Sequence, residues 1–240
     1  MPAALLLAVL FMPAGLNADE GRWKALNDTV VPQLMKGALP QAEQSAREAA
    51  AMAEKVFGAA HVNTAASLGN LALVLRYQKR YEESEKQYRR ALAIREKQLG
   101  PTHPNTALLM LNMADVVQSQ KKYTEAEKLQ RSVLAVFEKA HGDDVKTATA
   151  LNNLGANLQL QARYKEAEPL LKRALEMKEK VLGTVNQSVA HTLGNLAEVY
   201  EALGRKAEAD IYRRRAAEIF GMVPVNGVVR HSSPSEDNAL

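Results

Sequence analysis

The sequence predicts an all-α protein built from tandem helix pairs, and a repeat and the composition both support this. The stretch from Asn105 to Leu134 recurs in related form at 63–92, 146–175 and 188–217, a spacing of 41 or 42 residues. A fixed period of this length is typical of a solenoid, in which each unit packs against its neighbours. Aromatic residues make up only 5% of the chain, which favours helix packing through small residues over a β-sandwich.

Each repeat contains two helical stretches joined by a very short turn, so the two helices must lie antiparallel. The four clearer pairs are 63–78 with 81–98, 105–120 with 123–140, 145–161 with 164–181, and 188–203 with 206–220. A divergent first pair spans 23–36 and 42–57, where Pro32 is expected to disturb the first helix. We therefore predict about five helix-turn-helix repeats and ten helices, at about 20–60, 61–102, 103–143, 144–186 and 187–221.

Small residues mark where the two helices of a repeat should touch. One lies in each first helix and another follows twelve residues later in the second helix. The pairs are Ala72 and Ser84, Ala114 and Ala126, Gly155 and Ala167, and Ala197 and Ala209. Larger apolar residues at offsets of 3, 4 and 7 surround them, which predicts one buried stripe on each helix.

Loop residues separate the repeats and supply candidate helix caps. Asp143 or Asp144, and Asn186 or Ser188, are suitable N-caps for the helices that follow. His61 and His103 lie 42 residues apart, and with His141 fall in the joints. We interpret them as loop or cap residues rather than metal ligands.

Three stretches resemble the tetratricopeptide repeat family, in its kinesin-light-chain-like class. They are LGNLAEVY at 193–200, RYKEAEPLLKRAL at 163–175 and LGPTHPNTA at 99–107. The resemblance covers about 23–220, although Lys206 replaces the tyrosine that opens the other second helices. It implies a right-handed superhelix whose first helices line the concave side.

One asparagine recurs in each clear repeat on the side of the first helix opposite the buried stripe. These residues are Asn70, Asn112, Asn153 and Asn195. An amide both donates and accepts hydrogen bonds, so it can pair with the backbone of an extended peptide of any sequence. In the family that it resembles, this column is associated with peptide binding. The alternative is that each asparagine bonds to a neighbouring helix and holds the repeats in register.

Further residues on the same side complete the predicted peptide-binding site. They are Leu73, Tyr77, Leu108, Leu111, Asp115, Asn152, Leu160, His191 and Glu198. No column of lysine or arginine lies among them, which argues against capture of a peptide C-terminal carboxylate. We expect an extended ligand with apolar residues and a basic residue.

Composition and motifs give no support for several other functions. The net charge of +4 is small and dispersed, so nucleic acid is not an expected partner. The chain has no cysteine, and no catalytic or nucleotide-binding motif appears. We predict that the protein is not an enzyme and needs no metal or cofactor.

The two ends differ from the repeats. Residues 1–18 carry no charged side chain and contain an apolar run at 3–12, which predicts a signal peptide and export to the periplasm or medium. That run is too short to span a bilayer, so we expect no membrane span in the mature chain. The alternative is a cytoplasmic protein with a disordered or surface-packed apolar N-terminus. Residues 222–240 are expected to form a flexible tail.

These observations together predict a non-enzymatic scaffold for protein–protein interaction, a monomer or weak oligomer, that binds an extended segment of a partner. Two alternatives stay open. One is a structural or assembly subunit that self-associates through its convex face or its ends. The other is an accessory domain for a separate enzyme.

Overall fold

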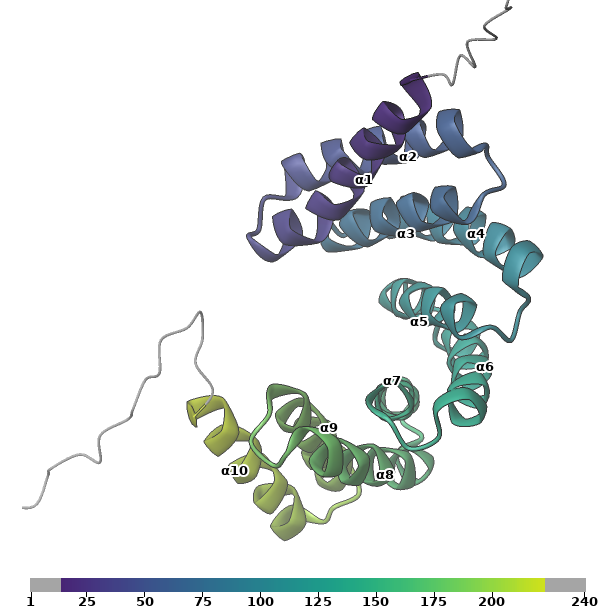
Figure 1. Ribbon diagram of the computed structural model, residues 1–240. Coiled ribbons are helices and arrows are strands. Elements are labelled where there is room, and N and C mark those ends of the chain that lie inside the picture. The colour runs from purple at the N-terminus through teal and green to yellow at the C-terminus, as the bar shows by residue number, and fades with distance from the viewer. Residues whose placement is uncertain (1–13, 223–240) are drawn as a thin grey trace, which may run out of the picture. The chain divides into compact units, whose positions relative to one another are not determined.

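The computed structural model describes residues 14–222, and this part of the chain contains ten helices and no strand (Figure 1). The helices are α1 (Ala14–Met35), α2 (Leu39–Phe57), α3 (Val62–Tyr77), α4 (Tyr81–Leu99), α5 (Pro104–Ser119), α6 (Tyr123–His141), α7 (Val145–Leu160), α8 (Tyr164–Leu182), α9 (Gln187–Ala202) and α10 (Lys206–Met222). The predicted all-α fold of tandem helix pairs is confirmed. The predicted tail and most of the predicted signal peptide lie outside the described residues.

The chain forms two compact units, 1–101 and 102–240. Unit 1 contains α1 to α4, and unit 2 contains α5 to α10. Within each unit every helix packs against the next one in the chain, and α1 also contacts α3 while α7 contacts α9. No helix in the described part of the chain is long and apolar enough to cross a membrane.

The predicted cap residues begin the first helices. Nδ1 of His61 accepts from the backbone N–H of Asn63 at 3.1 Å, and His103 does the same for Asn105. Oδ1 of Asp144 accepts from two backbone N–H groups at the start of α7, at 2.8 and 2.9 Å. These bonds satisfy amides that a helix start leaves without partners, and they confirm both histidines as caps.

Each turn within a repeat passes through the left-handed region of backbone conformation. The residue there is Lys79, Lys121, Ala162 or Gly204, with φ values of 61°, 64°, 58° and 76°. A side chain is disfavoured at such an angle, so three of the four turns are held against a local preference by the helices that they join.

Pro32 lies inside α1 and does not end it, because the helix continues three residues further, to Met35. Proline has no N–H, so one i→i−4 hydrogen bond is missing at this point. The helix also begins earlier than predicted, at Ala14. Gly37, with a φ of 73°, then allows the chain to turn toward α2.

The small-residue pairs hold the two helices of a repeat in close contact. Oγ of Ser84 donates to the carbonyl oxygen of Ala72 at 2.6 Å. A Cβ atom built onto Gly155 would lie 2.6 Å from Cγ of Leu171 and 3.5 Å from the carbonyl oxygen of Ala167. No side chain larger than hydrogen fits at Gly155 unless the Leu171 side chain moves.

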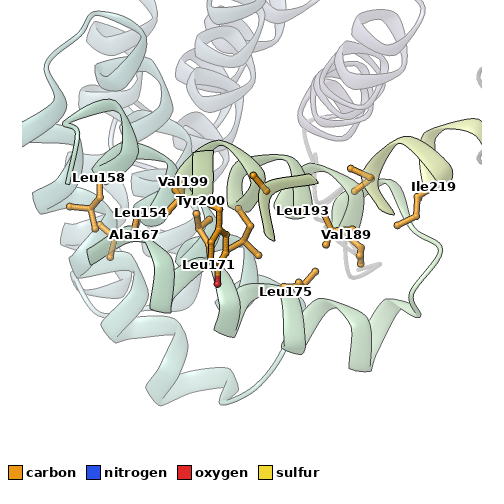
Figure 2. Close-up of a cluster of buried hydrophobic side chains, with 14 residues drawn as sticks. Leu154, Leu158, Ala167, Leu171, Leu175, Val189, Leu193, Val199, Tyr200 and Ile219 are labelled. Carbon is orange, nitrogen blue, oxygen red and sulfur yellow. The ribbon is translucent and has the colours of Figure 1, made fainter. Parts of the chain in front are cut away.

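Larger apolar residues fill the space around these contacts. In unit 2 one buried cluster runs from Leu154 and Leu158 on α7, past Leu171, to Leu193 on α9 and Ile219 on α10 (Figure 2). This cluster contains residues of the α7–α8 pair and of the α9–α10 pair. Neither pair could therefore bury this apolar surface alone.

A recurring charged contact joins neighbouring repeats within each unit, and we call it the inter-repeat clasp. An arginine just before a second helix pairs with a glutamate of the preceding repeat and with another on its own helix. The three groups are Arg80 with Glu43 and Glu83, Arg163 with Glu127 and Glu166, and Arg205 with Glu168 and Glu208. The arginine nitrogens lie 2.8, 2.6 and 3.1 Å from the glutamates of the preceding repeats.

A glutamine completes two of the three clasps. Gln78 and Gln161 donate to Glu43 and Glu127 at 2.8 and 3.0 Å. Partial burial raises the pKa of Glu43, but hydrogen bonds from Gln78, Arg47 and Arg80 outweigh it and hold the pKa at about 2. The clasp therefore stabilises the ionised carboxylate.

Two helical glycines of unit 2, Gly155 and Gly194, should respond in opposite ways to alanine. Gly155→Ala should lower the free energy of unfolding by about 1–3 kcal/mol, because the new methyl group meets Leu171. Gly194→Ala should raise it by about 0.5–1 kcal/mol, because nothing lies within 4 Å of that position and alanine favours helix. Urea unfolding followed by circular dichroism measures both. Equal changes in the free energy of unfolding for the two substitutions would contradict close packing of Gly155 against Leu171.

Acid should weaken the clasp of unit 1. Because its folded pKa is depressed, Glu43 contributes stability above its usual pKa of 4.5 and loses it as the pH falls through about 2. We expect the contribution to be about 1–3 kcal/mol, since the side chain is partly exposed. Urea midpoints measured from neutral pH to about pH 2 should fall less steeply for Glu43→Gln than for the unmodified chain. Parallel profiles would refute this role.

Candidate partner-binding face

In unit 1 the predicted asparagine bonds to the preceding first helix. Nδ2 of Asn70 donates to Oδ1 of Asn27 on α1 at 3.0 Å. The same oxygen accepts from Oγ of Ser67 at 3.0 Å, and that hydroxyl accepts from Nε1 of Trp23 at 2.8 Å. This network fixes the register of α3 against α1.

The two other predicted site residues of unit 1 differ in exposure. Leu73 is partly buried and packs against the apolar cluster that includes Val30 and Leu34. Tyr77 is 53% exposed, and the guanidinium of Arg76 lies 5.3 Å from the centre of its ring. Only Tyr77 of this pair offers a large accessible surface.

In unit 2 the predicted amides form a continuous chain of hydrogen bonds across α9, α7 and α5, which we call the amide ladder. Nδ2 of Asn195 donates to Oδ1 of Asn152 at 3.2 Å, and Nδ2 of Asn152 donates to Oδ1 of Asn153 at 3.5 Å. Nδ2 of Asn153 then donates to Oδ1 of Asp115 at 3.2 Å. The ladder aligns the first helices of three successive repeats.

Asn112 differs from the other members of its column. It is half-buried on α5, one turn before Asp115. Its side chain makes no hydrogen bond to any described residue of unit 2. Its amide therefore does not take part in the ladder.

The ladder leaves part of each amide available. A primary amide has two N–H donors and an oxygen that can accept two hydrogen bonds. Asn152 and Asn153 each use one donor and one acceptor site in the ladder, and Asn195 uses one donor. All three side chains are half-buried, so each keeps some contact with solvent while it takes part in the ladder.

A carboxylate and an open stretch of backbone lie beside the ladder on α9. Glu198 is exposed and accepts a hydrogen bond from Nε2 of Gln159 on α7. One turn earlier, Gly194 has nothing within 4 Å of the position where a side chain would begin. Since residues four apart on a helix lie above one another, this open stretch leads directly to Glu198.

The predicted apolar residues divide between exposed and buried positions. Leu108 on α5 and Leu160 on α7 are 45% and 51% exposed. Leu111 is only 7% exposed, so its side chain offers almost no surface to a ligand. His191 is exposed and makes an edge contact with the ring of Phe220 on α10, with ring centres 5.3 Å apart.

Charge is distributed unevenly between the first and second helices of unit 2. The first helices α5, α7 and α9 contain Asp115, Glu198 and Glu201 but only one lysine or arginine, Lys146. The arginines of this unit's described part lie elsewhere, at the clasps and on the second helices. We define the first-helix face as the side of α5, α7 and α9 that bears the amide ladder, and it is acidic and amide-rich.

The arginine run on α10 is engaged within the protein. Arg213 pairs with Glu201 and Asp210 at 3.0 and 2.5 Å, and Arg215 pairs with Glu179. Nε of Arg214 donates to a backbone carbonyl at 3.3 Å. No group of three or more potential metal ligands gathers anywhere in residues that the structure describes.

Comparison with protein-family models identifies the repeats. The tetratricopeptide repeat model matches residues 34–97, 68–139, 106–180 and 146–221. The chain belongs to the tetratricopeptide repeat family. Members of this family bind protein partners and are generally non-enzymatic.

Solved structures share the fold. Nearly identical TPR-like repeats of a putative kinesin light chain from Podosopora anserina align with a TM-score of 0.70 at 21% identity, covering 83% of this chain and 95% of that one. BtubC (BKLC) from P. vanneervenii aligns with a TM-score of 0.71 at 20% identity, covering 94% and 95%. The apo form of RapI aligns with a TM-score of 0.69 at 19% identity, covering 82% and 69%. A search of curated proteins gives no match.

The structure adds residues that the sequence analysis did not select. Gln159 orients Glu198, and Gly194 provides the open backbone beside it. The clasp was also missed, although its glutamates and arginines recur at the repeat spacing. Comparing every polar column at 41 and 42 residues would have found the clasp. The Gln159 contact has no such periodic signal.

Proposed function

We propose that the protein is an interaction scaffold that binds an extended peptide segment of a partner along the first-helix face. The amide ladder is the observation on which this proposal rests. It presents donors and acceptors at a regular interval across three repeats, and an extended peptide carries unpaired backbone N–H and C=O groups at a regular interval too.

The surroundings of the ladder suit such a ligand. Leu108 and Leu160 are exposed on the same set of helices, and apolar side chains of a peptide can cover them. Because the ladder is already formed, its side chains lose little further freedom on binding. The register and binding roles of the asparagines are therefore compatible.

The site provides no constellation for catalysis, and we propose that the chain is itself not an enzyme. The alternative of an assembly subunit makes a different prediction about size. A scaffold of this kind should remain a monomer or weak oligomer over a wide concentration range, whereas an assembly subunit should form defined oligomers.

Removing amides from the face should weaken peptide binding. Peptides are first selected from a displayed random library on the full chain, and the tightest is synthesised with a fluorescent label. Titration followed by anisotropy should show a dissociation constant about two- to tenfold higher for Asn112→Ala and for Asn195→Ala. An unchanged dissociation constant for both variants, with the fold intact, would rule out the proposed site.

Three variants separate effects on binding from effects on folding. Asn112→Ala should leave the free energy of unfolding within about 0.5 kcal/mol, because Asn112 makes no hydrogen bond within its unit. Asn153→Ala should lower it by about 0.5–1.5 kcal/mol, because it breaks the ladder. Ile211→Ala, on the exposed side of α10, should leave peptide binding unchanged.

Export through residues 1–18 is a further part of the proposal, supported by the apolar run at 3–12. Expression of the full chain in a bacterial host should give a shortened protein in the periplasmic fraction. A variant with Leu6→Arg and Leu7→Arg should stay in the cytoplasm at full length. Equal distribution of both proteins would contradict export.

A further inference from the structure

We infer that the first-helix face of unit 2 selects a basic partner segment, and that a lysine or arginine of this segment lies over Gly194 with its cation against Glu198. This inference rests on the proposed function and specifies the chemistry of its ligand. Three observations on the face support it.

The first observation is the state of the Glu198 carboxylate. It is exposed, and among the described residues its hydrogen-bond partner is the neutral amide of Gln159, with no ion pair. The clasp glutamates, by contrast, each contact at least one arginine or lysine. Glu198 thus holds a carboxylate beside Gln159 with which no cation of residues 14–222 pairs.

The second observation is the space next to that charge. Gly194 lies one turn before Glu198, and the position of its missing side chain is open. Gly155 has a packing reason to be glycine, but Gly194 has none, and glycine within a helix costs about 1 kcal/mol relative to alanine. A long aliphatic stem can lie along this exposed backbone and place its terminal cation at the carboxylate.

The third observation is the charge of the whole face. Lys146, at the start of α7, is the one lysine or arginine on the three first helices of unit 2, which also carry three acidic residues. One of these acids, Glu201, is paired with an arginine of α10, whereas the hydrogen-bond partner of Glu198 is a neutral amide. An acidic segment would be repelled here, while a basic one is attracted and oriented. Asn195, adjacent to Gly194, supplies an amide to the backbone of the same segment.

Peptide selection tests this inference directly. A displayed random heptapeptide library is panned against the full chain and against Glu198→Gln, Glu198→Lys and Glu218→Gln variants. Glu218 is the matched control, because it is exposed on α10 and its substitution removes the same charge from a second helix. Both substituted positions are on the surface, so loss of folding is not expected.

The expected result is a lysine or arginine at one aligned position in peptides selected by the full chain and by Glu218→Gln. Glu198→Gln should lose this preference, and Glu198→Lys should replace it with aspartate or glutamate. For a synthetic peptide, changing the selected lysine to glutamine should weaken binding about two- to fivefold, an effect that added salt diminishes. Gly194→Leu should weaken the lysine peptide more than the glutamine peptide.

Two results overturn the inference in distinguishable ways. Selected peptides that lack the cation, or keep it with Glu198→Gln, refute the basic subsite. If such peptides still bind less tightly to Asn112→Ala and Asn195→Ala, the proposed function survives without it. Failure to select any peptide on the full chain contradicts both.

Discussion

Close contact between paired helices at small residues is the constraint on which the rest of the structure depends. At Gly155 even one added methyl group would overlap the Leu171 side chain, so α7 and α8 pack closely there. That spacing places the buried stripe of each pair against the next repeat. In unit 2 it also leaves one side of α5, α7 and α9 partly exposed, and this side bears the amide ladder.

Two polar systems then fix how successive repeats are aligned. The clasp joins neighbouring repeats through ionised glutamates such as Glu127, and the ladder joins their first helices through neutral amides such as Asn153. In the clasp the arginines and glutamates pair with one another. In the ladder each amide keeps donors or acceptors that make no hydrogen bond to another ladder residue. The first-helix face is therefore more suitable for a ligand than the clasp.

Much of the fold could be predicted from periodicity, since the repeat spacing, the small-residue pairs and caps such as Asp144 are all local patterns. The buried polar contacts could not be. Asn157 occupies a column that elsewhere holds valine, and bonds to Gln130, which is fully buried. Lys178 is almost fully buried and donates to Oγ1 of Thr192 at 2.9 Å, and burial lowers its pKa to about 8. Such contacts depend on one partner from another helix, and a single sequence gives no sign of the pairing.

Only the periodic part of the candidate site could be predicted from the sequence. The asparagine column recurs at the repeat spacing and is therefore visible, whereas the hydrogen bond from Asn195 to Asn152 joins two helices without any periodic signal.

Contact between the amide ladder and the bound peptide can be measured directly. Side-chain amide resonances of Asn152, Asn153 and Asn195, assigned by single substitutions to alanine, can be followed by NMR as a selected peptide is added. The chemical shifts of these three side chains should change together and saturate as peptide is added. Those of the backbone amides in the second helices α6 and α8 should hardly change. Shifts confined to the second helices would contradict it.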